Sequence, residues 1–296
     1  MKRAVAPPAP VLVLGAVASV QSGAAVATRL FPDIGPMGTL LMRLGISALL
    51  LLAVARPRWS GRSRADIALV VAYAVALAAM NGTFYEALDR IPLGIAVTVE
   101  FVGPLAVAVG GSRRRLDVVW VVLAALGVVL LTSGGAKGVD LVGVMWAAIA
   151  GVFWAAYILI TQRVGRTYPG ATGLAMGLAI GTVCVLPFGI AAGGTTLLHP
   201  DVLGRGAAVA LLSSAVPYSL ELFALRRLRA SVFSVLMSLE PAMAAVSGLV
   251  FLGQHLKPRE WIAVGCVMTA SIGATRGARG AIPVEPGATP VEASAA

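Results

Sequence analysis

The chain has 296 residues, of which 58% are hydrophobic and only 12% are charged, and it carries a formal net charge of +10. Soluble domains contain about 25% charged residues. This composition, with a mean hydropathy of +0.91, therefore excludes an ordinary soluble protein and predicts a polytopic membrane protein. The basic residues lie between apolar segments and not on one face of a fold, which is typical of cytoplasmic loops and argues against binding to nucleic acid.

Ten apolar segments are long enough to cross a bilayer, which takes about 20 residues. The first follows Met1-Lys2-Arg3 and has the look of a signal peptide, but nine further spans follow, so we interpret it as an uncleaved first span. The end of the chain, 277–296, is rich in Pro, Gly, Ala and Glu and is predicted to be a disordered cytoplasmic tail. The predicted spans are residues 10–28, 37–55, 67–86, 92–111, 115–133, 140–162, 171–192, 206–225, 231–252 and 258–276.

The basic residues are shared unequally between the two sides of the membrane. With the N-terminus, residues 1–9, in the cytoplasm, sixteen Lys and Arg residues fall in cytoplasmic segments, six fall in external segments, and Arg43 lies within a span. Positive residues collect on the cytoplasmic side of membrane proteins. The bias therefore predicts that both termini are cytoplasmic.

The two halves of the chain resemble each other weakly. Pro104 and Pro241 are 137 residues apart, as are Ala87-Leu88 and Ala224-Leu225. Five spans per half is an odd number, so the second half enters the membrane upside down. The sequence thus predicts an all-α polytopic membrane protein of ten transmembrane helices in two inverted five-helix repeats, 10–133 and 134–276, which is an architecture of alternating-access transporters. Chance similarity between Ala-, Val-, Leu- and Gly-rich segments is the alternative.

Two glutamates lie inside apolar spans, and each precedes a proline. Pro104 cannot donate a hydrogen bond to the carbonyl of Glu100, so a free carbonyl and a carboxylate are expected at one level. Glu240 directly precedes Pro241. An acid within a span is costly unless it is protonated, paired or hydrated, so both are candidates for carrying a proton or binding an amine. The alternative for each is a structural hydrogen bond to a neighbouring helix.

The two acids are not equivalent under the 137-residue offset. Glu100 aligns with Met237, and Glu240 aligns with Gly103. The acids are therefore expected about one helical turn apart in depth. We expect unequal roles, with Glu100 the better proton or amine site.

Arg43 is a fixed positive charge within the second span. It is suited to hold a substrate carboxylate, to pair with one of the glutamates, or to extend from a helix end to the interface. In the eighth span, Pro217 frees the carbonyl of Ser213, and Glu221 follows one turn later on the same face.

Other polar or aromatic groups within the spans are candidates to line a cavity. Asn81 and Tyr85 share a helix face, although Tyr85, with Glu86, also suits the membrane interface. Trp154 and Tyr157 occupy roughly the place in the second half that Gln21 occupies in the first, although an aromatic residue on a span more often serves packing than binding. The candidate substrate-binding residues are Gln21, Arg43, Asn81, Tyr85, Tyr157, Tyr218 and Glu221, and the expected helix breaks are at Pro104, Pro217 and Pro241.

The chain has no sequence signature of an enzyme or of a metal site. No P-loop motif is present. His199 and His255 fall in predicted loops without ligand partners, and Cys184 and Cys266 lie in apolar segments as small hydrophobes. We therefore expect no metal, no cofactor, no disulfide and no catalytic activity, and a gradient-driven transport mechanism remains.

Three stretches resemble the EamA branch of the drug/metabolite transporter superfamily, in particular its exporters of threonine and homoserine. They read YEALDRIPLGIAVTVEFVGPLAVAV at 85–109, VPYSLE at 216–221 and LMSLEPAMAA at 236–245. The resemblance covers about residues 10–275. It implies a carrier of two inverted five-helix repeats in the bacterial cytoplasmic (inner) membrane that exports small neutral amino acids in exchange for protons.

Under this interpretation, Glu100 or Glu240 carries the proton, and Arg43 receives the substrate carboxylate or keeps a glutamate charged. The expected partners are a small amino acid, protons and the lipid bilayer, and a homodimer is compatible with the sequence. The first alternative is a broader metabolite or toxic-compound exporter of the same superfamily. An integral-membrane enzyme or a scaffold is a further alternative, but a scaffold has no need of acids inside the membrane.

Overall fold

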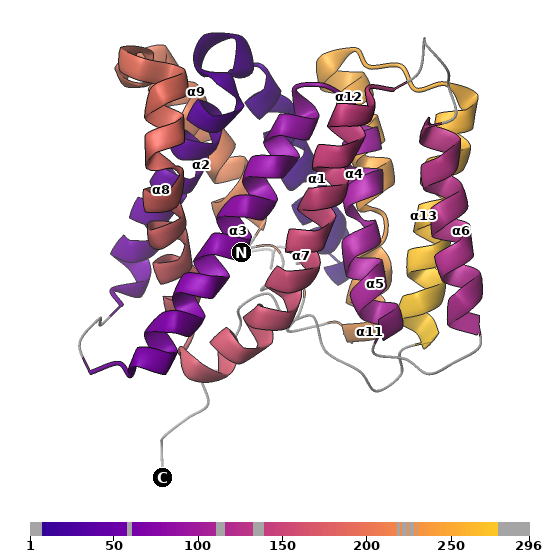
Figure 1. Ribbon diagram of the computed structural model, residues 1–296, viewed down its shortest axis with the longest axis horizontal. Coiled ribbons are helices and arrows are strands. Elements are labelled where there is room, and N and C mark those ends of the chain that lie inside the picture. Colours follow the sequence, from indigo (N-terminus) through magenta and orange to yellow (C-terminus); the bar gives the residue numbers. More distant parts are fainter. Residues whose placement is uncertain are drawn as a thin grey trace, which may run out of the picture.

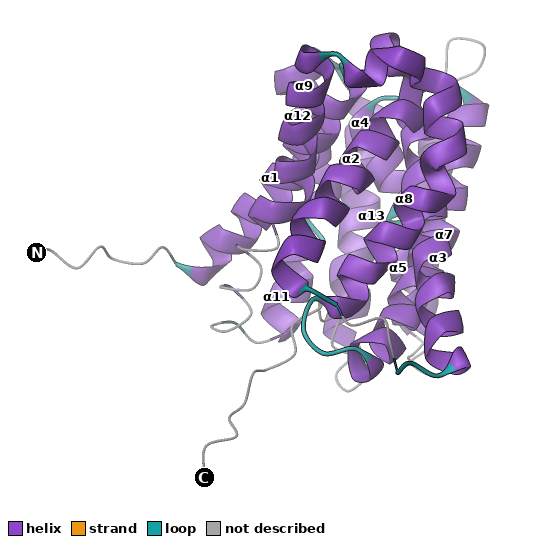
Figure 2. Cartoon of the chain, turned by 90° about the vertical axis from the view of Figure 1, so that its left-hand side faces the viewer, coloured by secondary structure: helices purple, strands orange, loops and turns teal. Residues whose placement is uncertain are grey.

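The computed structural model describes residues 8–57, 61–110, 116–132, 139–217, 220, 224, 228 and 230–277, and in these residues the secondary structure is helical with no β-strand. The helices form one bundle whose long members run roughly parallel to a common axis (Figures 1 and 2). Their bounds are α1 Ala9–Thr28, α2 Phe31–Ala55, α3 Arg64–Leu88, α4 Leu93–Glu100, α5 Val102–Gly110, α6 Leu116–Thr132, α7 Leu141–Thr167, α8 Thr172–Gly193, η2 Gly194–Leu198, α9 Pro200–Ala210, η3 Leu211–Ala215, α11 Ala230–Met237, α12 Glu240–Leu252 and α13 Pro258–Gly277.

Seven helical segments in the described part of the chain are long and apolar enough to cross a membrane. They are α1, α2, α3, Leu93–Gly110, α7, Thr172–Leu198 and Val235–Leu252, and α6 is a shorter apolar helix. Many Val, Leu and Ile side chains on the outside of the bundle are exposed, as expected where lipid replaces water as the surrounding medium. The predicted class, an all-α polytopic membrane protein, is confirmed. The predicted tail, 277–296, lies outside the described residues after Gly277.

Two membrane segments are interrupted near their middle. α4 ends at Glu100 and α5 begins at Val102, and α11 ends at Met237 and α12 begins at Glu240. In Figure 1, α4 and α5 form one interrupted rod. Each interruption lies just before a proline, because a proline is tolerated in the first turn of a helix, where its missing N–H would have no partner.

The start of α2 bends sharply at Gly35. This glycine has φ 68° and ψ 171° and is followed by Pro36. A positive φ with extended ψ is essentially restricted to glycine. The hydroxyl of Thr39 donates to the Gly35 carbonyl over 2.9 Å. The bend therefore has an internal polar brace.

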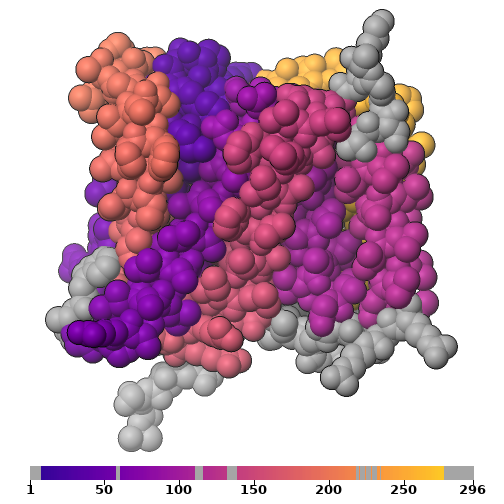
Figure 3. All heavy atoms as spheres, viewed as in Figure 1, coloured from indigo at the N-terminus to yellow at the C-terminus, as the bar shows by residue number. Residues whose placement is uncertain are grey.

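The helices pack in pairs that are far apart in the sequence. α2 lies against α8, α3 against α7, and α6 against α13, while α12 contacts both α1 and α4. The space-filling view shows α3 and α7 side by side across one face, with α6 at its edge (Figure 3). Small residues allow these approaches, because close backbone packing supplies much of the association energy of helices in lipid.

The contact between α4 and α12 is one of these close approaches. A Cβ atom on Gly94 would lie 2.7 Å from the Cα and 2.8 Å from the Cβ of Ala245. The two helices therefore meet with almost no side chain between them. This places the middle of α12 directly against the first turn of α4.

We expect Gly94→Ala to destabilise the protein by about 1–3 kcal/mol, because the added methyl group overlaps a backbone atom that cannot rotate away. Thermal unfolding of the purified protein in detergent measures the effect. Gly265→Ala on α13 is the matched control, since no atom lies within 4 Å of its added Cβ, and it should be neutral or slightly stabilising. Equal unfolding temperatures for Gly94→Ala and the unchanged protein would contradict the tight contact.

Candidate functional site

Glu100 and Glu240 lie at the two helix interruptions and are both buried, with exposed fractions of 7% and 9%. The charge of Glu240 acts on Glu100, and so does that of Arg43 on α2. Glu100 is therefore close enough to Glu240 and to Arg43 for the charge of each to act on it. This group of Arg43, Glu100 and Glu240 is called the central charge cluster below.

The two carboxyl groups extend from about the same level of the bundle. α4 and α12 touch at Gly94 and Ala245. Glu100 is six residues after Gly94 on α4, and Glu240 is five residues before Ala245 on α12. At 1.5 Å per residue, the two acids are about 9 and 7.5 Å from the contact along their helices. The difference in depth between the two acids is therefore smaller than the one helical turn that the sequence alignment predicts.

The acids meet opposite ends of helices. Glu240 is the first residue of α12 and Glu100 is the last residue of α4. The N-terminus of a helix carries partial positive charge and its C-terminus partial negative charge. A negative charge is thus favoured by the local helix at Glu240 and opposed by it at Glu100.

Arg43 is held by Tyr85 on the neighbouring helix. Its Nη1 atom donates to the Tyr85 hydroxyl over 3.4 Å, and its Cζ atom lies 5.7 Å from the centre of the Tyr85 ring. The Tyr85 side chain is fully buried and packs against Phe31 and Phe84. Tyr85 therefore belongs to the interior of the bundle, and its immediate effect is to orient Arg43.

The carbonyl of Glu100 faces α7. A Cβ atom on Gly151 would lie 2.7 Å from this oxygen, and a Cβ atom on Gly103 would overlap the Gly151 carbonyl. The ring of Phe101 meets that of Trp154 edge-on at 5.5 Å. The carbonyl that the sequence predicts to be free is therefore covered by the backbone of α7, while the carboxyl group belongs to the central charge cluster.

Gln21 and Asn81 are buried polar groups. Gln21 on α1 is 3% exposed, and its Oε1 atom has no hydrogen-bond partner among the described residues. The Nδ2 atom of Asn81 donates to the Leu77 carbonyl over 2.8 Å within α3. An orphaned buried oxygen is costly, so Gln21 has an acceptor available for a ligand.

Tyr157 lies in a packed aromatic pair. Its ring stacks on Tyr73 at 5.1 Å, and the two hydroxyl groups are 3.2 Å apart. The pair joins α7 to α3 beside the buried side chains of Val164 and Tyr168. This arrangement corresponds to the packing alternative for Tyr157.

The eighth predicted span contains a local widening of the helix. Residues Leu211–Ala215 form one turn of π-helix, η3, ahead of Pro217, and such turns are common at functional sites. Ser19 on α1 donates to the Leu212 carbonyl over 2.7 Å, and Ser47 on α2 meets Ser214 at 2.9 Å.

Tyr218 and Glu221, which the sequence places in the cavity, lie outside the described residues. Ser19 and Ser47 were not candidates on sequence grounds. Their only signal was a hydroxyl group within an apolar span. Within the described part of the chain, no group of three or more His, Cys, Asp or Glu side chains is placed to hold a metal ion.

Comparison with known proteins gives one family. The model of the EamA-like transporter family matches residues 141–276. The threonine/homoserine exporter RhtA of Escherichia coli strain K12 is 46% identical over 268 residues, which is 90% of this chain and 90% of that protein. The protein of the same name from Salmonella typhimurium strain LT2 is 45% identical over 270 residues, or 90% of this chain and 91% of that protein.

A protein of known crystal structure has a similar fold. It superposes with a TM-score of 0.63 and covers 92% of this chain and 97% of its own, at 18% identity. The resemblance identified in the sequence is confirmed by the curated relatives, because they align with nine-tenths of the chain at more than 40% identity. The chain is therefore a multi-pass membrane protein that belongs to the EamA-like transporter family.

Proposed function

We propose that this protein is a secondary-active exporter of small neutral amino acids of the threonine and homoserine type, which exchanges substrate for protons across the bacterial inner membrane by alternating access. The observation that carries the proposal is the central charge cluster, Arg43, Glu100 and Glu240, at two helix interruptions. It occurs in a chain whose relatives at 45–46% identity are named threonine/homoserine exporters.

The proposed architecture is ten transmembrane helices in two inverted repeats, 10–133 and 134–276. In it α1 corresponds to α7, α2 to α8, and α3 to α9 with η3. The interrupted segment α4–α5 corresponds to α11–α12, and α6 corresponds to α13. The contacts support this pairing: α2 meets α8, α4 meets α12 and α6 meets α13, so each meets its own counterpart. Because α7 corresponds to α1, and α3 corresponds to α9 with η3, the contact of α3 with α7 has its counterpart in the contact of α1 with α9 and η3.

The proposed orientation places both termini in the cytoplasm. The bias of Lys and Arg residues supports it. The turns between α1 and α2, between α3 and α4, and between α12 and α13 are then external. The breaks in α4–α5 and α11–α12 lie inside the membrane, where transporters of inverted repeats bind their substrates.

A neutral amino acid presents a carboxylate and an ammonium group, and the central charge cluster offers a partner to each. The guanidinium group of Arg43 suits a carboxylate, which it can bind through two parallel hydrogen bonds. Glu100 or Glu240 suits an ammonium group. Two acidic groups repel each other in a medium of low dielectric constant, so a bound proton or a bound ammonium group relieves the same repulsion.

Competition for one carboxylate would couple the two fluxes. A proton and an ammonium group cannot both occupy the same acid, so release of substrate outside leaves the acid free to take up a proton. The loaded and protonated forms then return through opposite states of the carrier, with each ligand shifting the populations. This exchange requires no covalent step.

We assign the exchanging role to Glu100 and a more permanently charged role to Glu240. The assignment is supported by their helix ends, since the end of α4 opposes a negative charge and the start of α12 favours one. Gln21 and Asn81 are proposed to line the cavity, and Tyr85 to orient Arg43. Tyr157 is proposed to join α3 to α7, whereas Tyr218 and Glu221 remain proposed cavity residues.

We expect proteoliposomes loaded with labelled threonine to release it faster when the outside is made acidic. Glu100→Gln removes a charge-assisted bond to the ammonium group, about 1.5–3 kcal/mol, which is roughly a 10- to 150-fold loss of affinity. It should also abolish the response to the pH gradient. Glu240→Gln should reduce the rate while leaving part of that response.

Two results would exclude proton coupling through these acids. One is efflux from the unchanged protein that does not respond to the gradient. The other is full gradient-driven transport by the Glu100→Gln, Glu240→Gln double variant. Glu86→Gln is the control, because Glu86 is a half-buried acid of α3 outside the central charge cluster.

We expect Tyr85→Phe to raise the KM for threonine while leaving the pH-gradient dependence unchanged, because the variant keeps the ring but loses the hydroxyl that accepts from Arg43. Arg43→Lys should raise KM further, since an ammonium group cannot bind a carboxylate through two parallel bonds. Initial efflux rates over a range of internal threonine concentrations measure both effects. Tyr73→Phe, which removes a hydroxyl from the Tyr73–Tyr157 pair, is the control. An equal rise in KM in this control would refute a specific role for Tyr85.

A substrate panel tests the breadth of the carrier. We expect threonine and homoserine to be exported well, and bulky or permanently cationic dyes to be exported poorly, because the central charge cluster matches a zwitterion of small size. Growth protection against dyes, without protection against toxic analogues of these amino acids, would instead support a broader metabolite or toxic-compound exporter.

A further inference from the structure

The turn that joins α1 to α2 makes polar contacts with two elements far away in the sequence. We call residues Arg29–Gly35 the α1–α2 corner. Arg29 reaches the end of α12, and Asp33 reaches α9. Both targets belong to the second half of the chain, so this corner connects α9 and α12 at one end of the bundle.

The contact of Arg29 is with a helix C-terminus. Its Nη2 atom donates to the carbonyl of Phe251 over 2.5 Å. The last carbonyls of a helix lack partners within the helix, and a positive charge is favoured next to them. The contact is exposed, so water can replace the arginine when the two parts separate.

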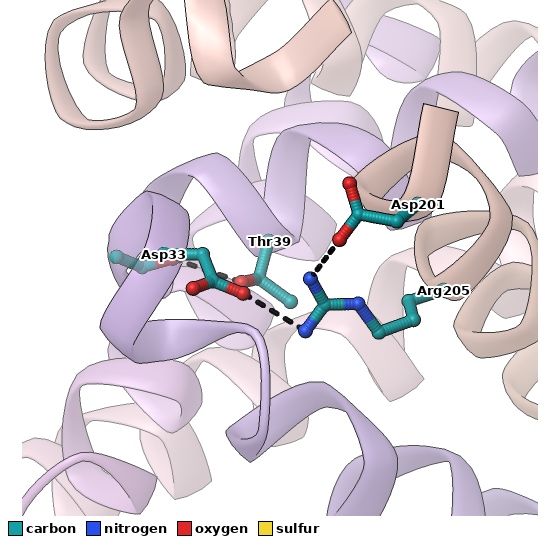
Figure 4. A network of polar contacts seen from close by, with 5 residues as sticks. Asp33, Thr39, Asp201 and Arg205 are labelled. Carbon is teal, nitrogen blue, oxygen red and sulfur yellow. Dashed lines mark hydrogen bonds and ion pairs between the residues drawn. The ribbon is translucent and has the colours of Figure 1, made fainter. Parts of the chain in front are cut away.

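The contact of Asp33 is an ion pair with Arg205, whose Nη1 atom lies 2.8 Å from the carboxylate. Arg205 also pairs with Asp201, one turn earlier on α9, at 2.5 Å. Figure 4 shows the guanidinium group between the two carboxylates. Asp201 and Arg205 belong to the same helix, so of these two ion pairs it is the one with Asp33 that joins α2 to α9.

The α1–α2 corner itself is firmly built. Leu30 and Ile34 are fully buried. The bend at Gly35 is braced by the hydroxyl of Thr39. The two polar arms therefore extend from a corner that is buried at Leu30 and Ile34 and braced at Gly35.

We propose that the α1–α2 corner is the external gate of the carrier, with Arg29 and Asp33 as its two latches. The gate is closed in this structure, and both latches release when α9 and α12 move away from the corner to open the site to the outside. Exposed ion pairs stabilise a contact only weakly, so they can bias two states without locking either. This inference rests on the proposed alternating-access function.

The ion pair of Arg90 with Asp140 is not part of the proposed gate. Arg90 pairs with Asp140 at 3.5 Å between the ends of α3 and α7. At the opposite end of the same helix pair, the Tyr168 hydroxyl donates to the Asp66 carbonyl over 2.8 Å. α3 and α7 are thus fastened at both ends and are expected to move together.

The test measures access to a buried cysteine beneath the Asp33–Arg205 latch. Thr39 is fully buried and lies next to the latch in Figure 4. Thr39→Cys is introduced into the full chain with Cys184→Ser and Cys266→Ser. Cells are then treated with a membrane-impermeant maleimide, without added substrate. Met42→Cys, at the contact of α2 with Gly206 of α9, is a second reporter in case the first variant does not fold.

We expect Asp33→Asn, and separately Arg29→Gln, to raise the labelling rate about two- to five-fold, the range that follows from the strength of one exposed pair. Asp33→Glu should keep the rate of the unchanged protein, since it keeps the charge. Asp201→Asn is the matched control because it contacts the same guanidinium group within one helix, and Arg90→Gln is the control for the α3–α7 pair. Neither should change the rate.

Unchanged labelling in Asp33→Asn and Arg29→Gln would overturn the gate. A lower unfolding temperature in the same variants would then show that these contacts are structural only. Equal increases in Asp33→Asn and Asp201→Asn would also overturn it. Labelling is measured without substrate, so this failure is distinct from that of the proposed function. Threonine efflux by the unchanged protein in proteoliposomes tests the proposed function separately.

Discussion

The interior of a bilayer offers no water, so every backbone group and every charge placed there must find its partner within the protein. The centre of this molecule depends on how that requirement is met at two interruptions, between α4 and α5 and between α11 and α12. The first is covered by α7, where Gly103 and Gly151 bring two backbones together. The second is joined to α13 by the buried hydroxyl groups of Ser238 and Ser271, which are 2.8 Å apart.

These different supports give the two acids different surroundings, although both belong to the same charge cluster. Glu100 is the last residue of α4, while Glu240 is the first residue of α12. The backbone around Glu100 is fixed by helix packing that leaves no space for a Cβ atom. A rigid backbone keeps the carboxyl group of Glu100 in place, which is what the exchanging role proposed above requires.

Much of the fold could be predicted from the sequence, because hydrophobic length, prolines and basic turns are local signals. The predicted span 171–192 and the observed α8, Thr172–Gly193, show how well apolar length sets the ends of a helix. The burial of Glu100 and Glu240 within the bundle was also predictable, since an acid in an apolar span stands out. Helix rotation was not, because helices rich in Ala, Val and Gly present similar faces in every direction. The stacking of Tyr157 on Tyr73 and the covered carbonyl of Glu100 therefore required the structure.

The contact of Gly94 with Ala245 has a mechanical meaning. Most helix pairs interlock through ridges of side chains, which must climb over one another before the helices can turn. Here a bare backbone meets a single methyl group, so there are no ridges to disengage. α4 and α12 can therefore turn about this point, which lies in the first turn of α4 and near the middle of α12. The bundle thus contains a pivot point between one and two helical turns from its two buried acids.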